Sequence, residues 1–166
     1  DTCALFIVLN DYLRSAGFRR VVYRPIPWIY HRHPSEEDLY AIFWKCGARL
    51  RTRNIGTTIF VQQHLRWRKD HLRRLRNAHD GGVTVVRDDS LVAFWPLLEA
   101  NLMHRFGASP VHTLREMELL KGRFPDSIIQ YNAYREGRII GGLTFYITPQ
   151  VVHGQYSSTN DEGKAY

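Results

Sequence analysis

Cysteine is scarce in this chain of 166 residues: Cys3 and Cys46 are the only two, and they are not spaced like metal ligands. So few thiols favour reduced, structural cysteines over a disulfide framework, although a single disulfide between the two stays open. His31 and His33 flank an arginine but have no third ligand at a metal-like spacing, which argues against a zinc site. We therefore expect no metal.

Long hydrophobic runs are also absent. No stretch of about 18 apolar residues occurs, so we expect no membrane span. The sequence does not begin with Met and shows no charged-then-apolar leader, which makes a cytoplasmic location the expectation and leaves a trimmed signal open. A hydrophobic content of 44% predicts a packed core of one domain, or of one domain and a fragment of another.

Acidic residues are outnumbered, since 23 Lys and Arg against 16 Asp and Glu give a formal net charge of +7. The excess is concentrated in residues 49–76, where Asp70 is the one acid. Such a field attracts phosphates, and a solvated basic face is the alternative. Lys69, Arg73 and Arg76 recur at the spacing of one helical face, so they are the predicted phosphate contacts.

The first half of the chain predicts helices and strands separated by a proline-marked linker. Helical spacing of apolar residues covers 2–16 and 35–46, and a third, basic helix is expected over 65–80 with its leucines inward. Phe18–Tyr23 and Thr57–Val61 are rich in β-branched and aromatic residues, so both are predicted strands.

The second half predicts one strand, two helices and three antiparallel strands. Pro96 lies inside the helix expected over 90–105, so it predicts either a kink there or a restart with this proline in a first turn. Thr113 with Glu116 forms a capping box. Glu136-Gly137 is a two-residue turn between apolar runs, which is typical of a hairpin. The expected elements are a strand at 83–86, helices at 90–105 and 113–121, and strands at 128–134, 139–147 and 151–156.

Several segments in this order resemble the FemAB-like acyltransferases, a branch of the GNAT superfamily. They correspond to a strand, the exit of a basic helix, a hairpin with a glycine pair, and the next strand with its loop. The segments are 57–61, 73–85, 133–143 and 153–163. The resemblance covers roughly residues 57–166 as a GNAT-like acyltransferase domain, and 1–56 resembles the end of a preceding GNAT-like half.

The resemblance implies a mixed α/β, three-layer fold with a largely antiparallel central sheet flanked by helices. On this comparison the chain is expected to be incomplete at both ends and to stop before the last helix and strands of the domain. The implied activity is transfer of an acyl or aminoacyl group to an amine. The donor would be an acyl-CoA such as acetyl-CoA, or an aminoacyl-tRNA, with no metal.

The resemblance also implies where the donor would lie. Its extended arm would run along the third strand of the meander, and its phosphates would meet the loop that follows. The residues implied in donor binding are Ser157, Ser158, Thr159, Asn160, Gly163 and Lys164.

Three residues are candidates for acid–base chemistry, which acylation of an amine requires. Tyr156 could act as an acid, or it could be a packed strand tyrosine with its hydroxyl at the rim. His153 shares a face with Tyr156 only if a bulge intervenes, and Gly154 could provide one. His112 precedes a helix N-terminus, where its neutral form is favoured; a loop histidine bonded to backbone is the alternative.

Two other functions stay open. A nucleic-acid-binding module without chemistry is favoured by the basic helix and by Trp67 within it. A catalytically silent GNAT-like scaffold would bind neither kind of ligand.

Overall fold

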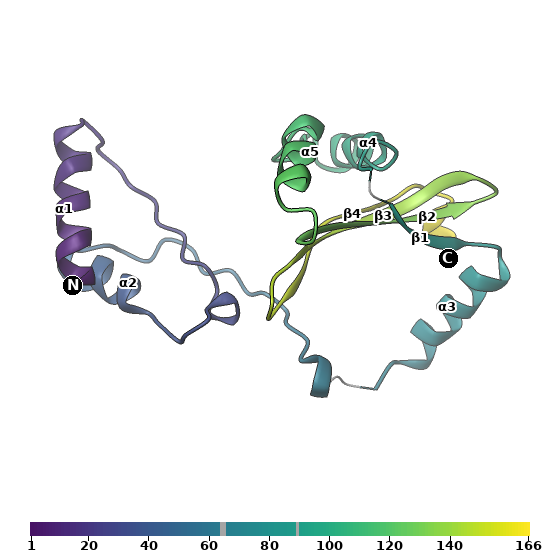
Figure 1. Cartoon of the computed structure of the whole chain (residues 1–166), viewed down its shortest axis with the longest axis horizontal. Coiled ribbons are helices and arrows are strands. Elements are labelled where there is room, and N and C mark those ends of the chain that lie inside the picture. Colours follow the sequence, from purple (N-terminus) through teal and green to yellow (C-terminus); the bar gives the residue numbers. More distant parts are fainter. Residues whose placement is uncertain (64–65, 89) are drawn as a thin grey trace. The chain divides into compact units, whose positions relative to one another are not determined.

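The computed structural model describes residues 1–63, 66–88 and 90–166. The chain divides into two compact units, Asp1–His64 and Leu65–Tyr166 (Figure 1). Helices and a four-stranded antiparallel sheet confirm the expected mixed α/β class. Among the described residues, every helix is too short or too polar to span a bilayer.

The first unit begins with helix α1, Thr2–Ser15. Its N-cap is Asp1, whose carboxylate accepts a hydrogen bond from the Cys3 amide at 2.9 Å. The chain then runs through an extended linker to a single 3-10 turn, Trp28–Tyr30. This linker contains two prolines, which explains why no regular helix forms there.

The second helix is shorter than the apolar spacing predicts. It forms α2, Glu37–Tyr40, and continues as a π-helical turn over Ala41–Lys45. The extra residue in that turn shifts the inward face, so Ala41 is fully buried while Phe43 is exposed.

Both strands predicted in the first half of the chain are wrong. Phe18–Tyr23 and Thr57–Val61 are irregular, apart from a 3-10 turn over Val61–Gln63. Side-chain shape favours an extended backbone in both, but a strand requires a second strand to satisfy its amides and carbonyls. In the described part of the chain, neither segment has such a neighbour.

The basic helix is α3, Lys69–Asp80. Its predicted start at Leu65 lies outside the described residues. The prediction that its leucines point inward is wrong, since Leu72 is 43% and Leu75 is 69% exposed. Apolar periodicity defines a helix face but does not supply the element that would cover it.

The second unit is built on a sheet with strand order β1-β2-β3-β4, antiparallel throughout. The strands are β1 (Thr84–Asp88), β2 (Ile128–Arg135), β3 (Arg138–Ile147) and β4 (Val152–Thr159). The chain ends in a 3-10 turn, Gly163–Ala165.

Helices α4 (Trp95–Phe106) and α5 (Leu114–Arg123) lie on one face of this sheet (Figure 1). Of the kink and the restart expected at Pro96, the structure has the restart, since α4 begins at Trp95 with Pro96 in its first turn. The Thr113–Glu116 capping box opens α5 as predicted. The core between these helices and the sheet is formed by Leu91, Phe94, Trp95, Leu98, Met117 and Ile128.

Candidate functional site

A bulge in β4 turns two candidate residues onto the same face of the sheet. Thr144 of β3 pairs with Tyr156, but the next residue, Phe145, pairs with Gly154, so β4 carries one extra residue here. His153 pairs with Tyr146. Because residues 144 and 146 lie on one face of β3, their partners Tyr156 and His153 also share a face.

The structure brings Tyr156 and His112 into direct contact. The Tyr156 hydroxyl lies 2.6 Å from His112 Nδ1, and the two rings meet edge to face with centroids 6.1 Å apart. His112 is held in place because the next residue, Thr113, is the N-cap of α5. Both side chains are half-buried, so the hydrogen-bonded pair lies at the edge of the core.

Trp95 packs against this pair from α4. Its ring meets the Tyr156 ring edge to face at 5.5 Å, and the side chain is 2% exposed. Its Nε1 is buried and has no hydrogen-bond partner among the described residues. Tyr146 is nearby in the same layer, with its hydroxyl 3.2 Å from Met117 Sδ, and burial raises the pKa of that hydroxyl.

A buried polar layer fills the helix-covered face of the sheet and was not predicted. Thr144 Oγ1 donates to Gln130 Oε1 at 2.5 Å, and Gln130 Nε2 donates to Asn132 Oδ1 at 2.7 Å. Asn132 Nδ2 then donates to the Asp88 carboxylate at 2.9 Å. The one signal in the sequence is that Gln130 and Asn132 are two residues apart in a predicted strand and so share a face. The same spacing is typical of a solvent-facing side of a sheet.

Asp88 anchors this layer at the end of β1. Its carboxylate accepts hydrogen bonds from the Ser90 amide at 2.9 Å and from the Tyr134 hydroxyl at 3.2 Å. The Ser90 amide, with smaller contributions from Asn132, Tyr134 and the charge of Lys121, lowers the pKa of Asp88 despite its partial burial.

The residues implied in donor-arm binding alternate along β4. Ser158 points into the core, where its hydroxyl accepts from Asn101 Nδ2 at 2.8 Å and lies 3.3 Å from the Leu97 carbonyl. Ser157 and Thr159 are exposed. Only these two side chains of the three are therefore open to a ligand.

The loop after β4 folds back on β3. The amide of Asn160 donates to the Ile140 carbonyl at 3.0 Å, and Asn160 Oδ1 accepts from the Gly163 amide at 2.8 Å. Lys164 forms an ion pair with Asp161 at 2.7 Å. A phosphate bound by this loop would have to compete with the Asp161 carboxylate.

Arg135 connects the loop to the end of α3. Its Nε donates to the Gly81 carbonyl at 3.0 Å and its Nη1 bonds Glu162 at 3.0 Å. Lys69, Arg73 and Arg76 are exposed on α3. With a helical rise of about 1.5 Å per residue, Arg76 lies about 7.5 Å along the axis from Gly81 and Lys69 about 18 Å. Arg76 is thus the nearest of the three to the loop.

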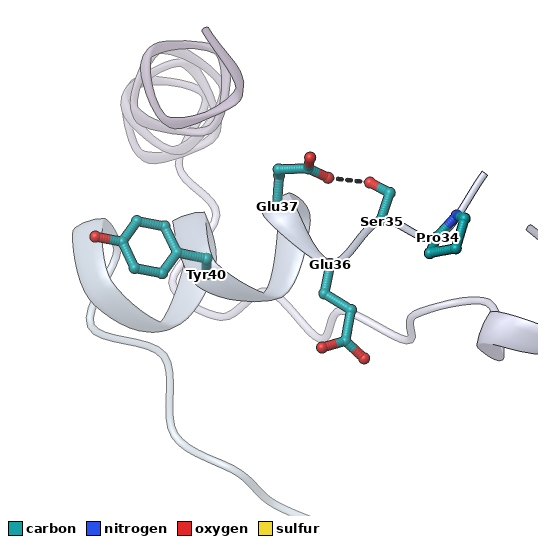
Figure 2. A pocket seen from close by; sticks show the side chains of 5 residues that line it. All are labelled: Pro34, Ser35, Glu36, Glu37 and Tyr40. Carbon is teal, nitrogen blue, oxygen red and sulfur yellow. Dashed lines mark hydrogen bonds between the residues drawn. The ribbon is translucent and has the colours of Figure 1, made fainter.

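The first unit carries a shallow, open hollow lined by Pro34, Ser35, Glu36, Glu37 and Tyr40. Figure 2 shows Ser35 directed at Glu37, and its hydroxyl donates to that carboxylate. The N-cap of α2 is Glu36, which makes no side-chain cap hydrogen bond. No predicted site residue lines this hollow.

In the described ranges, no cluster of three or more His, Cys, Asp or Glu side chains could hold a metal ion. No protein-family model matches this sequence, and no curated protein matches it either. The geometry of the second unit is therefore the basis for a functional proposal.

Proposed function

We propose that the unit Leu65–Tyr166 is an acyltransferase domain of the FemAB-like GNAT type, which transfers an acyl group from a thioester donor to an amine. The observation that carries this proposal is the 2.6 Å contact between Tyr156 and His112 beside the bulge in β4. Both residues are candidates for acid–base chemistry, and they are 44 residues apart in the sequence. The contact brings them together at the strand proposed to hold the donor.

The pair can act as a proton relay. In the neutral pair Tyr156 donates its hydroxyl proton to His112 Nδ1, which leaves the lone pairs of the phenol oxygen available. As an amine attacks the thioester carbonyl, that oxygen can accept the amine proton while its own proton passes to His112. The imidazolium can then return a proton through Tyr156 to the departing thiolate.

Strand β4 supports binding of an extended donor arm. It lies at one edge of the sheet, so a ligand can add to the backbone groups on its outer side. The Thr159 carbonyl is already bonded, since it accepts from Asn101 Nδ2 at 2.9 Å. Exposed Ser157 and Thr159 follow Tyr156 on this strand. An arm paired there would place its thioester end close to the Tyr156 hydroxyl.

An acyl-CoA such as acetyl-CoA is the proposed donor, and an aminoacyl-tRNA is the alternative. The loop from Asn160 to Lys164 would meet the donor phosphates. We also propose a cytoplasmic location, which is supported by the two thiols, since neither Cys3 nor Cys46 forms a disulfide.

Release of free thiol from acetyl-CoA in the presence of a panel of primary amines tests this function. Tyr156→Phe keeps the ring and its packing on Trp95 but removes the proton-transfer group, so the rate should fall about 100-fold or more. Tyr146→Phe is the matched control, because it removes a hydroxyl from the same layer without touching His112. Equal rates for Tyr156→Phe and the unmodified chain would contradict the relay.

The silent scaffold is separated by the same assay combined with binding. A scaffold would release no thiol and would bind no acetyl-CoA. A chain that binds acetyl-CoA but releases no thiol would have a donor site and lack only the acyl-transfer step.

A further inference from the structure

Helix α3 carries four basic residues against two acids, Asp70 and Asp80. Its outer surface presents Lys69, Arg73, Arg74 and Arg76, all exposed. In the described part of the chain, none of these four forms an ion pair with an acidic side chain. The acid closest in sequence, Asp70, is already paired with Arg68 at 3.3 Å.

This charge destabilises the helix as it stands. Lys69 and Arg73 are four residues apart and Arg73 and Arg76 three, so like charges face one another on neighbouring turns. Lys69 is also the first residue of α3, where the helix dipole disfavours a cation. A polyanion laid along α3 would remove both penalties.

Apolar and aromatic groups border the cations. Trp67, just before α3, is 63% exposed and lies against the ring of His71, with centroids 6.3 Å apart. Leu72 is adjacent to Arg76, whose Nε donates to the Leu72 carbonyl at 3.3 Å. Exposed indole and aliphatic surface beside a row of cations is what unpaired bases need, because their faces stack while their phosphates meet charge.

We propose that α3, with Trp67, is a binding surface for single-stranded nucleic acid, independent of the acyl-transfer site. The cations contact the phosphodiester backbone and Trp67 stacks on a base. An anionic membrane is a poorer fit, because the apolar face of α3 has only Leu72, Leu75 and Ala78 and is interrupted by His71 and His79. A duplex is also disfavoured, since its stacked bases are closed to Trp67.

Fluorescence anisotropy with a labelled, unstructured 16-nucleotide RNA, and with DNA of the same sequence, tests this surface on the whole chain. With four phosphate contacts on a single strand, raising KCl from about 50 to about 200 mM should weaken binding about 50-fold. In the variant Arg73→Ala/Arg74→Ala/Arg76→Ala, one contact remains, and the same change should weaken binding only about threefold.

The matched control is Arg105→Ala/Arg115→Ala/Arg123→Ala, which removes the same charge from exposed sites on α4 and α5. It should keep the steep salt dependence. Circular dichroism should show both variants folded, since alanine favours helix. Trp67→Ala should weaken single-strand binding about tenfold and leave a hairpin duplex unaffected.

Three results would overturn the proposal: equal losses in the two triple variants, no binding to either strand at about 50 mM KCl, or preference for the duplex. A fourth is binding to vesicles of phosphatidylcholine with phosphatidylserine that requires α3, without binding to RNA or DNA. Equal affinity for RNA and DNA agrees with backbone contact and stacking, whereas a preference for RNA adds recognition of the 2′-hydroxyl.

Discussion

Replacing Gly142 of β3 with alanine should strongly destabilise the second unit, because the added methyl group has no room. An ideal Cβ there would lie 2.4 Å from Phe94 Cδ2, 2.7 Å from Asn132 Oδ1 and 2.9 Å from Gln130 Nε2. Carbon atoms in contact are about 3.5–4.0 Å apart, so the Phe94 ring would have to retreat by about 1 Å or more. Phe94 is fully buried, and its neighbours would have to move with it.

The expected magnitude follows from these contacts. Overpacking a core costs about 1–3 kcal/mol. Breaking the buried hydrogen bond between Gln130 and Asn132 costs about 1–3 kcal/mol more. We expect the free energy of unfolding to fall by about 3 kcal/mol, equivalent to a fall in Tm of about 12–24 °C for a domain of this size.

Urea denaturation followed by circular dichroism measures the effect, with two other glycines as controls. Alanine at Gly154 would meet only Leu143 Cδ1, at 3.6 Å, so the change should stay below about 0.5 kcal/mol. Gly122 in α5 has open space around it, and alanine there should stabilise by about 0.5–1 kcal/mol. A Gly142→Ala variant within about 0.5 kcal/mol of the unmodified chain would refute the packing of Phe94 on β3.

Two further predictions concern the polar contacts that fix the second unit. Thr113→Ala removes the cap of α5 and should lower the free energy of unfolding by about 1 kcal/mol in urea denaturation, while Thr113→Ser should restore it; equal values for both would exclude the cap. The lowered pKa of Asp88 means that its ionised form stabilises the fold above its ordinary value of 3.8, a contribution lost as pH falls through the lowered pKa. In the variant Asp88→Asn, Tm should therefore fall less as the pH is lowered than in the unmodified chain, whereas the exposed control Asp126→Asn should not show this change. Identical profiles of Tm against pH for the two variants would contradict the stabilising role of ionised Asp88.

Elements with local signals were predictable from the sequence. Three signals depend only on residues close together in the sequence, so they can be recognised before the fold is known. They are the capping box at Thr113, Pro96 at the start of α4 and the Glu136-Gly137 turn. At the turn both residues have positive φ, 50° for Glu136 and 75° for Gly137, as a two-residue hairpin turn requires.

Features that depend on a distant partner were not predictable. Thr57–Val61 has the composition of a strand but no neighbour to pair with in the described chain, and Leu72 and Leu75 form an apolar face that stays exposed. The polar layer reverses the usual rule, because Gln130 and Asn132 alternate as a solvent face would and yet lie beneath Phe94. Composition alone does not show which face of a sheet will be covered by helices.

The candidate site combines both kinds of information. His112 is fixed by a local signal, the helix start at Thr113, and the bulge that the sequence raised as a condition lies between Gly154 and Tyr156. The hydrogen bond between His112 and Tyr156 joins residues 44 apart, so only the fold establishes it. The role of Tyr156 in proton transfer stays a prediction.

The most direct test of the central claim is a calorimetric and thermal-shift titration of the whole chain with acetyl-CoA and with desulfo-CoA, at low and moderate salt. A donor site along β4 predicts saturable stabilisation by both ligands that survives moderate salt and that a Ser157→Pro substitution in β4 weakens. No stabilisation at millimolar ligand, or stabilisation that moderate salt abolishes completely, would contradict a thioester donor on this strand.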